Sequence, residues 1–176
     1  MRASMTLFDV LNDDDVAWLR TICRRVTLRA GDVLIECDRE GGDVVILLDG
    51  RCSVRAADGS SLGTLTRGDV VGEVTFIDGR RTLARVAAET PVVGAAVARA
   101  DLEARLQASP AFAARFYLGV ARVLAYRLRR NLQATLRRGE DVLDASREFE
   151  GELDLAGLDG TARAGARLAG LYDHLR

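Results

Sequence analysis

The chain has 176 residues, of which 48% are hydrophobic and 29% charged, as expected for a globular protein large enough to form one domain with its own core. The formal net charge of −1, from 25 basic and 26 acidic residues, argues against a surface built for wholesale attraction to nucleic acid or membrane. The amino terminus turns acidic at Asp13–Asp15 before any long apolar run develops, so we expect no signal peptide, no membrane span and a cytoplasmic location.

The first predicted element is a helix over residues 6–25. Asn12 is a suitable helix cap, and the three aspartates that follow it place negative charge in a first turn, where the helix dipole favours it. Val16 and Leu19 then recur at helical spacing.

From Val26 to Val97 the chain consists of short apolar runs separated by turn residues. Glycine and aspartate stand side by side at near-regular intervals, at Gly31-Asp32, Gly42-Asp43, Asp49-Gly50, Asp58-Gly59 and Gly68-Asp69. Strand-length segments punctuated in this way are typical of an antiparallel sandwich or jelly roll. We therefore predict a mainly β fold with flanking helices, arranged as an eight-stranded roll.

Helices are predicted again from Arg99 onward. Asp101–Ala108 forms a short one, and Pro110 fits the first turn of a long one. Apolar residues recur every fourth position along the long helix, at Phe112, Phe116, Val120, Leu124, Leu128, Leu132 and Leu136. Because such a row drifts around a helix, part of it should pack on the roll and part on a partner, which predicts a homodimer through helix 111–138.

The remaining chain is expected to form an acidic linker and a short helical tail. Residues 140–155 are acidic, Gly157–Gly160 is expected to act as a hinge, and Thr161–Leu175 has the pattern of a final helix. We accordingly divide the chain into residues 1–138 and residues 139–176. The basic stretch Arg127–Arg138 is interpreted as the solvated face of the long helix.

Catalytic and metal-binding patterns are not evident. The single histidine, His174, stands alone near the end of the chain, and neither a phosphate loop nor a dinucleotide fingerprint is present. Cys23, Cys37 and Cys52 lack the spacing of a metal site, and we expect them to be small buried or half-buried residues. We predict a protein that is not an enzyme and holds no metal or cofactor.

The segment Gly68–Ala88 contains the candidate ligand-binding residues. A strand ends at Gly72-Glu73, a short helical turn follows, and a basic loop leads into a new strand. Backbone N–H groups in such a turn can cradle an anion, an arginine can clamp a phosphate, and a glutamate can accept hydrogen bonds from ribose hydroxyls.

This segment resembles the phosphate-binding cassette of the cyclic-nucleotide-binding domain family, to which the bacterial catabolite activator protein and the regulatory subunit of cAMP-dependent kinase belong. The resemblance extends over roughly residues 6–138, with further matches at Leu7-Phe8, Gly31–Ile35, Leu47–Gly50 and Phe112–Phe116. It is strongest to single-domain bacterial members that lack a helix-turn-helix. The resemblance implies that the ligand-binding residues are Gly72, Glu73, Val74, Arg81, Thr82, Leu83 and Ala84.

The residues that would hold the cyclic phosphate depend on the register of the loop. Without gaps, the phosphate pair falls on Thr82 and Leu83, neither of which can neutralise a phosphate. A one-residue slip places the pair on Arg81 and Thr82 but requires a bulge at Leu83-Ala84, because a slipped strand would otherwise turn every side chain to the wrong face. Arg80 and Arg85 are further candidates.

Three functions follow. The first is a non-enzymatic regulatory protein that binds a cyclic nucleotide, expected to be cAMP, and signals through its C-terminal helix to a protein partner, without contact with DNA or membrane. The second is a degenerate roll that binds no nucleotide and serves as an interaction scaffold. Arg81 pointing into the concave face near Glu73 would favour the first function, and Arg81 pointing to solvent would favour the second. The third is a cyclic-dinucleotide sensor that uses Arg80, Arg81 and Arg85.

Overall fold

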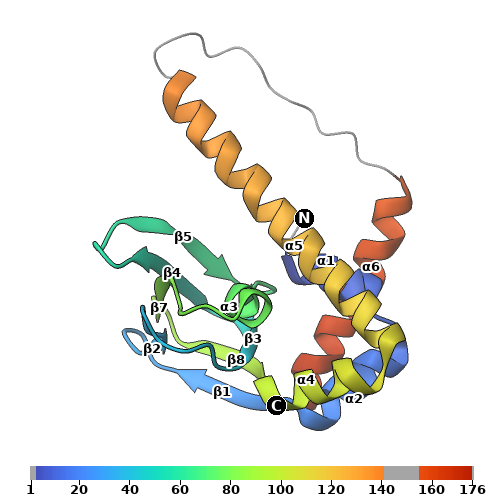
Figure 1. Cartoon of the computed structure of the whole chain (residues 1–176). Helices are drawn as coiled ribbons and strands as arrows, with labels where there is room; N and C mark the ends of the chain where they lie inside the picture. The colour runs from blue at the N-terminus through green and yellow to red at the C-terminus, as the bar shows by residue number, and fades with distance from the viewer. Residues whose placement is uncertain (1–2, 141–154, 176) are drawn as a thin grey trace.

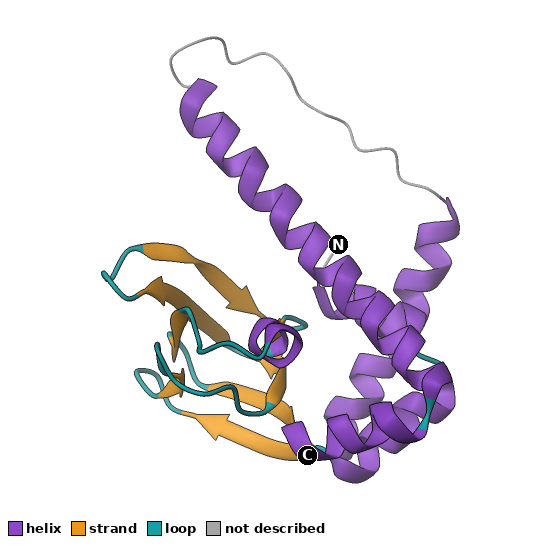
Figure 2. Cartoon of the chain, in the orientation of Figure 1, coloured by secondary structure: helices purple, strands orange, loops and turns teal. Residues whose placement is uncertain are grey.

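The computed structural model describes residues 3–140 and 155–175 (Figure 1). Within them eight strands form two four-stranded antiparallel sheets, which confirms the predicted roll, and most of the helices gather on one side (Figure 2). The strands are β1 (Arg24–Leu28), β2 (Val33–Ile35), β3 (Val44–Asp49), β4 (Arg51–Ala56), β5 (Ser61–Thr66), β6 (Val70–Val71), β7 (Ala84–Ala88) and β8 (Val92–Val97). The helices are α1 (Ala3–Val10), α2 (Asp13–Ile22), α3 (Glu73–Asp78), α4 (Arg99–Ala108), α5 (Pro110–Glu140) and α6 (Leu155–His174).

Strand β3 separates two hydrophobic cores. The sheet orders are β1-β8-β3-β6 and β2-β7-β4-β5. Because successive side chains of a strand point to opposite faces, Val45 and Leu47 pack between the two sheets, while Val44, Ile46 and Leu48 pack against the helices. The roll and the helical layer are therefore joined through one strand, which is buried from Val44 to Leu48.

The amino-terminal helix is broken, so the prediction of one helix over residues 6–25 is wrong. Asn12 caps α2: its side chain accepts a hydrogen bond from the Asp15 backbone N–H at 2.9 Å, and the Asp15 carboxylate accepts one from the Asn12 N–H at 3.0 Å. This reciprocal capping box starts a new helix and turns the chain at Leu11-Asn12. The turn lets α1 pack along α5.

Helix α5 is buried at apolar positions along its first half and exposed at two apolar positions further along. Phe112, Phe116 and Val120 are buried in the helical core, whereas Leu128 and Leu132 are 60% and 54% exposed. The helix continues past the roll in Figure 1. Its first half is therefore fixed by packing, and its second half presents an apolar row on the surface.

Helix α6 begins earlier than predicted and passes through Gly157–Gly160 without a hinge, so the hinge prediction is wrong. Its buried face, which includes Leu168 and Leu171, joins the helical core beside α1 and α2. Arg167 anchors it by donating to two backbone carbonyl oxygens at the end of α1, at 2.8 and 2.7 Å. The predicted acidic linker lies mostly outside the described residues. None of the helices described has both the length and the apolar character needed to cross a bilayer.

The three cysteines have the environments that were predicted. All are free thiols; Cys52 is buried, and Cys23 and Cys37 are partly buried. Burial raises the pKa of Cys52 to about 11, with a further contribution from the nearby Glu89 charge, so this thiol is unreactive at neutral pH.

Candidate functional site

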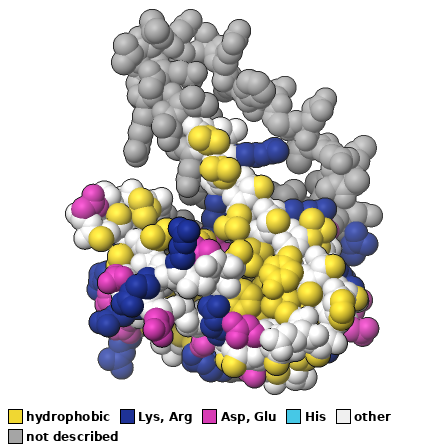
Figure 3. Space-filling view, in the orientation of Figure 1, with side chains coloured by type: hydrophobic (Ala, Val, Ile, Leu, Met, Phe, Trp, Pro, Cys, Tyr) yellow, Lys and Arg dark blue, Asp and Glu magenta, His cyan; other side chains and the backbone are white. Residues whose placement is uncertain are grey.

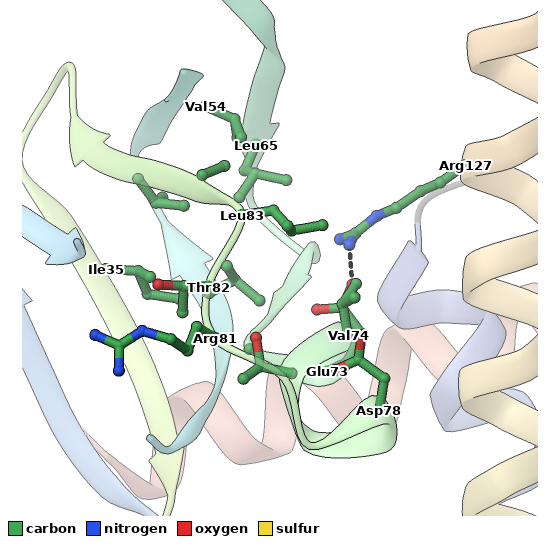
Figure 4. Close-up of a pocket in the computed structure, with 15 residues that line it drawn as sticks. Ile35, Val54, Leu65, Glu73, Val74, Asp78, Arg81, Thr82, Leu83 and Arg127 are labelled. Atoms are coloured by element: carbon green, nitrogen blue, oxygen red, sulfur yellow. Dashed lines mark hydrogen bonds and ion pairs between the residues drawn. The ribbon is translucent and has the colours of Figure 1, made fainter. Parts of the chain in front are cut away.

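A cavity of about 170 Å³ lies between α3, β7 and the side of α5 (Figure 4). The seven residues singled out in the sequence all lie on its wall: Gly72, Glu73, Val74, Arg81, Thr82, Leu83 and Ala84. Other residues complete the wall, namely Ile35, Val54, Leu65, Val71, Thr75, Asp78, Val86 and Arg127. The fold thus gathers the cassette around one hollow.

The backbone turn at Gly72 places Glu73 in this hollow. Gly72 has φ of +91°, and a Cβ atom at this position would lie 2.5 Å from the carbonyl oxygen of Asp43. Only glycine allows both the left-handed conformation and this close approach. Helix α3 starts directly after it, so that the Glu73 side chain is only 2% exposed.

The Glu73 carboxylate forms an ion pair with Arg127 of α5, drawn as a dashed line in Figure 4. Arg127 also donates a hydrogen bond to the backbone carbonyl of Val70, at the start of β6. Burial raises the pKa of Glu73 above its ordinary value, and the Arg127 charge opposes this shift. One guanidinium group therefore links the long helix to the cassette.

The interpretation of the basic stretch as a solvated face is wrong for its first residue. Arg127 has a side chain only 27% exposed, and it points inward rather than to solvent. The helical spacing contained the signal: Arg127 lies four residues after Val123 and seven after Val120, both of which are buried. Residues at these separations share one face of a helix.

Thr82 is committed to the neighbouring loop. Its hydroxyl donates to the carbonyl oxygen of Glu36 at 2.6 Å and accepts from the Arg39 N–H at 2.9 Å. The Thr82 N–H donates to the Arg39 carbonyl at 2.8 Å. Leu83, the next residue, is 75% exposed at the rim of the cavity.

The register of β7 is regular against β4. Ala84 pairs with Ala56 and Ala88 with Cys52 without interruption. The irregularity in the β7 pairings lies in β2, between Val33 and Ile35. The pairing of β7 with β4 therefore shows no bulge from Ala84 to Ala88, and Leu83 lies in the loop before the first paired residue.

The Arg81 guanidinium group turns away from Glu73 in Figure 4. Its Nε donates to a carboxylate oxygen of Asp38 at 2.6 Å, and its Nη2 donates to the Asp38 backbone oxygen at 2.5 Å. Arg85 forms an ion pair with Glu36 at 3.3 Å. The aliphatic part of Arg81 thus lines the cavity, and its guanidinium group binds the adjoining loop. Because the charge points away from Glu73, this orientation favours a scaffold over a nucleotide-binding protein.

Comparisons with known proteins identify the domain. The cyclic nucleotide-binding domain profile matches residues 25–109. A cyclic nucleotide-binding protein from Geobacter metallireducens has the same fold at 19% identity, with a TM-score of 0.61 over 67% of this chain and 88% of its own. The N-terminal domain of a transcriptional regulator from Streptomyces coelicolor is 26% identical, with a TM-score of 0.58 over 81% of this chain and 93% of its own.

A third similar structure is the regulatory subunit of a cAMP-independent protein kinase A from Trypanosoma brucei. It is 25% identical, with a TM-score of 0.51 over 60% of this chain and 43% of its own. A triple variant of that subunit, with a TM-score of 0.51 and 25% identity, is bound to cAMP. A search of curated protein sequences found no significant match. The profile match and these structures together show that residues 25–109 fit the cyclic nucleotide-binding domain family.

Proposed function

We propose that this chain is a regulatory protein without catalytic activity, whose roll senses a nucleotide-type ligand, with cAMP as the reference ligand of the family. The cavity wall supports this proposal because it combines one buried carboxylate, Glu73, with an apolar floor that includes Val54 and Leu65. A carboxylate is a strong acceptor for ribose hydroxyls, and apolar side chains suit a base.

The Glu73–Arg127 ion pair is the observation that carries the regulatory part of the proposal. Any ligand that contacts Glu73 lies beside a side chain of α5, one turn beyond the buried Val123. A change in how firmly Arg127 is held would alter the position of the distal half of α5. Such coupling requires that the ligand bind more tightly in one helix position than in the other.

Titration calorimetry with adenosine, guanosine, cAMP and cGMP tests the binding proposal on protein verified as ligand-free. Glu73→Gln keeps the size of the side chain but removes its charge. We expect it to lower the affinity for the tightest-binding ligand roughly tenfold to a hundredfold, the contribution of a hydrogen bond to a charged group. Glu89→Gln, at an exposed glutamate outside the cavity, is the matched control. Absence of heat with every ligand at millimolar concentration would refute nucleotide sensing.

The apolar row on α5 supports a homodimer as part of the same proposal. Leu128 and Leu132 of this row are 60% and 54% exposed, and Tyr117 and Leu118, which are not part of the row, are 49% and 48% exposed. Figure 3 shows hydrophobic side chains gathered over the face along which α5 runs. Exposed apolar patches of this kind are typical of interaction sites.

Sedimentation velocity tests the dimer. We expect Leu128→Glu to shift the chain toward monomer at micromolar concentration, because the charge would be buried at the interface between two copies. Leu62→Glu changes a leucine of β5 that is 54% exposed, against 60% for Leu128, and should leave the sedimentation coefficient unchanged. A wild-type monomer at all concentrations would contradict this part of the proposal.

The second candidate function is a scaffold that binds no nucleotide. The orientation of Arg81 toward Asp38, and the absence of a cation at Thr82 and Leu83, favour it. In this case the roll would be a rigid support for α5, and the calorimetric experiment above would give no signal for any nucleoside or nucleotide.

The trypanosome structures bear on the choice between ligands. The triple variant bound to cAMP carries Glu to Ala, Thr to Arg and Val to Ala substitutions, the last two at consecutive positions. The present chain has Thr82-Leu83 where the family resemblance expects an arginine beside a small residue. The threonine and valine that the variant replaces are similar in type to Thr82-Leu83 of this chain. This likeness is a reason to test the charge at the phosphate position separately from the rest of the site.

A further inference from the structure

The cavity wall offers no uncommitted positive charge in the described part of the chain. The titratable side chains that line it are Glu73, Asp78, Arg81 and Arg127. Arg81 is paired with Asp38 outside the cavity, and Arg127 is paired with Glu73 inside it. A cyclic phosphate would bring a further negative charge into a site where both guanidinium groups already have carboxylate partners.

A change of partner costs more for Arg127 than for Arg81, because the Arg127 pair is largely buried and the Arg81 pair is exposed. If Arg127 turned to a phosphate, Glu73 would lose its counter-ion while only 2% exposed, and a buried carboxylate without a partner is strongly unfavourable. If Arg81 turned inward, it would give up its bonds to Asp38. It would also have to pass Thr82, in the loop before β7, whose hydroxyl is fixed to the 36–39 loop.

A neutral sugar avoids these costs. Arg127 engages one oxygen of the Glu73 carboxylate, and the other oxygen is the acceptor that a ribose hydroxyl would use. The base would contact apolar wall residues such as Val54, Leu65 and Leu83. The cavity volume of about 170 Å³ is small, which disfavours a ligand as large as a cyclic dinucleotide.

We infer that this site takes a neutral nucleoside in preference to the corresponding 3′,5′-cyclic phosphate, and that the missing cation at Leu83 sets this preference. The inference rests on the proposed function, because it narrows the ligand class of the same cavity. Leu83 is the position to alter because it lies on the wall, is 75% exposed and is directed across the mouth of the cavity toward Arg127 (Figure 4).

The test compares adenosine with cAMP, and guanosine with cGMP, by calorimetry at one pH and one salt concentration. In the wild-type protein we expect the nucleoside to bind at least about tenfold more tightly than its cyclic phosphate, the discrimination that an uncompensated charge produces. Leu83→Arg should raise the affinity for cAMP roughly tenfold to a hundredfold through a charge-assisted hydrogen bond. Added salt should then lower the affinity of Leu83→Arg for cAMP but not its affinity for adenosine.

Leu62→Arg is the matched control, because it adds the same charge at a comparably exposed leucine of β5 that is not on the cavity wall. Tighter binding of cAMP than of adenosine by the wild-type protein would overturn the inference and leave the proposed function intact. If Leu83→Arg and Leu62→Arg raise the affinity for cAMP equally, or if neither raises it, the role of Leu83 is overturned. Absence of binding by nucleosides and nucleotides alike would instead refute the proposed function. The wild-type ranking decides the ligand class even if Leu83→Arg fails to fold.

Discussion

Replacement of Asp15 by alanine should lower the free energy of unfolding by about 2–4 kcal/mol, the combined cost of losing a helix cap and the charge-assisted hydrogen bonds from Arg115. The Asp15 side chain is 1% exposed, and both of its oxygens accept hydrogen bonds from Arg115 of α5, at 2.6 and 2.9 Å. The same carboxylate closes the capping box with Asn12. The substitution therefore removes a helix cap and leaves the Arg115 guanidinium group without its carboxylate partner.

Urea denaturation measures this effect, with Asp14→Ala as the control. Asp14 is the preceding residue, lies in the same first turn and is exposed, so its loss should cost less than about 1 kcal/mol. Similar losses for the two variants would show that general charge near the helix start, rather than the contact with Arg115, stabilises α2.

The pH dependence of the difference identifies its cause. Burial alone would raise the pKa of Asp15, but hydrogen bonds from Arg115 and Asn12 and the Arg115 charge hold it below its ordinary value. A lowered folded-state pKa gives stability that is present above the unfolded-state pKa near 3.9 and is lost as pH falls through the folded-state value. The gap between wild type and Asp15→Ala should therefore narrow below about pH 4. The raised pKa of Glu73 acts in the opposite direction but is common to both proteins, so it cancels in the comparison.

The parts of this structure that sequence reasoning predicted are those encoded by local patterns. The roll follows from apolar runs and turn pairs, the α2 cap from Asn12 and the residues after it, and the buried half of α5 from the row that begins at Phe112 and Phe116. The cassette motif also located the residues of the cavity wall, because the turn at Gly72 depends on a glycine that can be read directly.

The parts that it missed depend on partners distant in the sequence. Arg127 meets Glu73 across 54 positions, and Arg81 meets Asp38 across 43, so no local pattern specified either pair. The continuous α6 has a related origin, because its packing against α1 outweighs the weak helix propensity of its glycines. The break at Leu11-Asn12 is different, because the local capping box of Asn12 and Asp15 starts a new helix there.

The Gly72→Ala substitution should have the largest effect on the site itself. Gly72 has φ of +91°, and an added Cβ would approach the Asp43 carbonyl oxygen to 2.5 Å, so the backbone has to move. We expect a loss of more than about 2 kcal/mol, since a left-handed conformation alone costs an alanine roughly 1–2 kcal/mol. The movement shifts the start of α3 and with it the Glu73 carboxylate, so ligand binding should fall together with stability.

Gly79→Ala separates the cost of the left-handed backbone from the cost of the close contact with Asp43. Gly79 ends the same helix with φ of +67° and has nothing within 4 Å of an added Cβ. Gly79→Ala should lower the free energy of unfolding, measured by urea denaturation, by about 1 kcal/mol, from backbone conformation alone. It should leave the ligand affinity measured by calorimetry within about twofold of wild type. If Gly72→Ala costs no more than Gly79→Ala and binds ligand equally well, the contact between Gly72 and Asp43 does not hold Glu73 in place. In that case the ion pair with Arg127 of α5 would be the contact that holds the carboxylate in place.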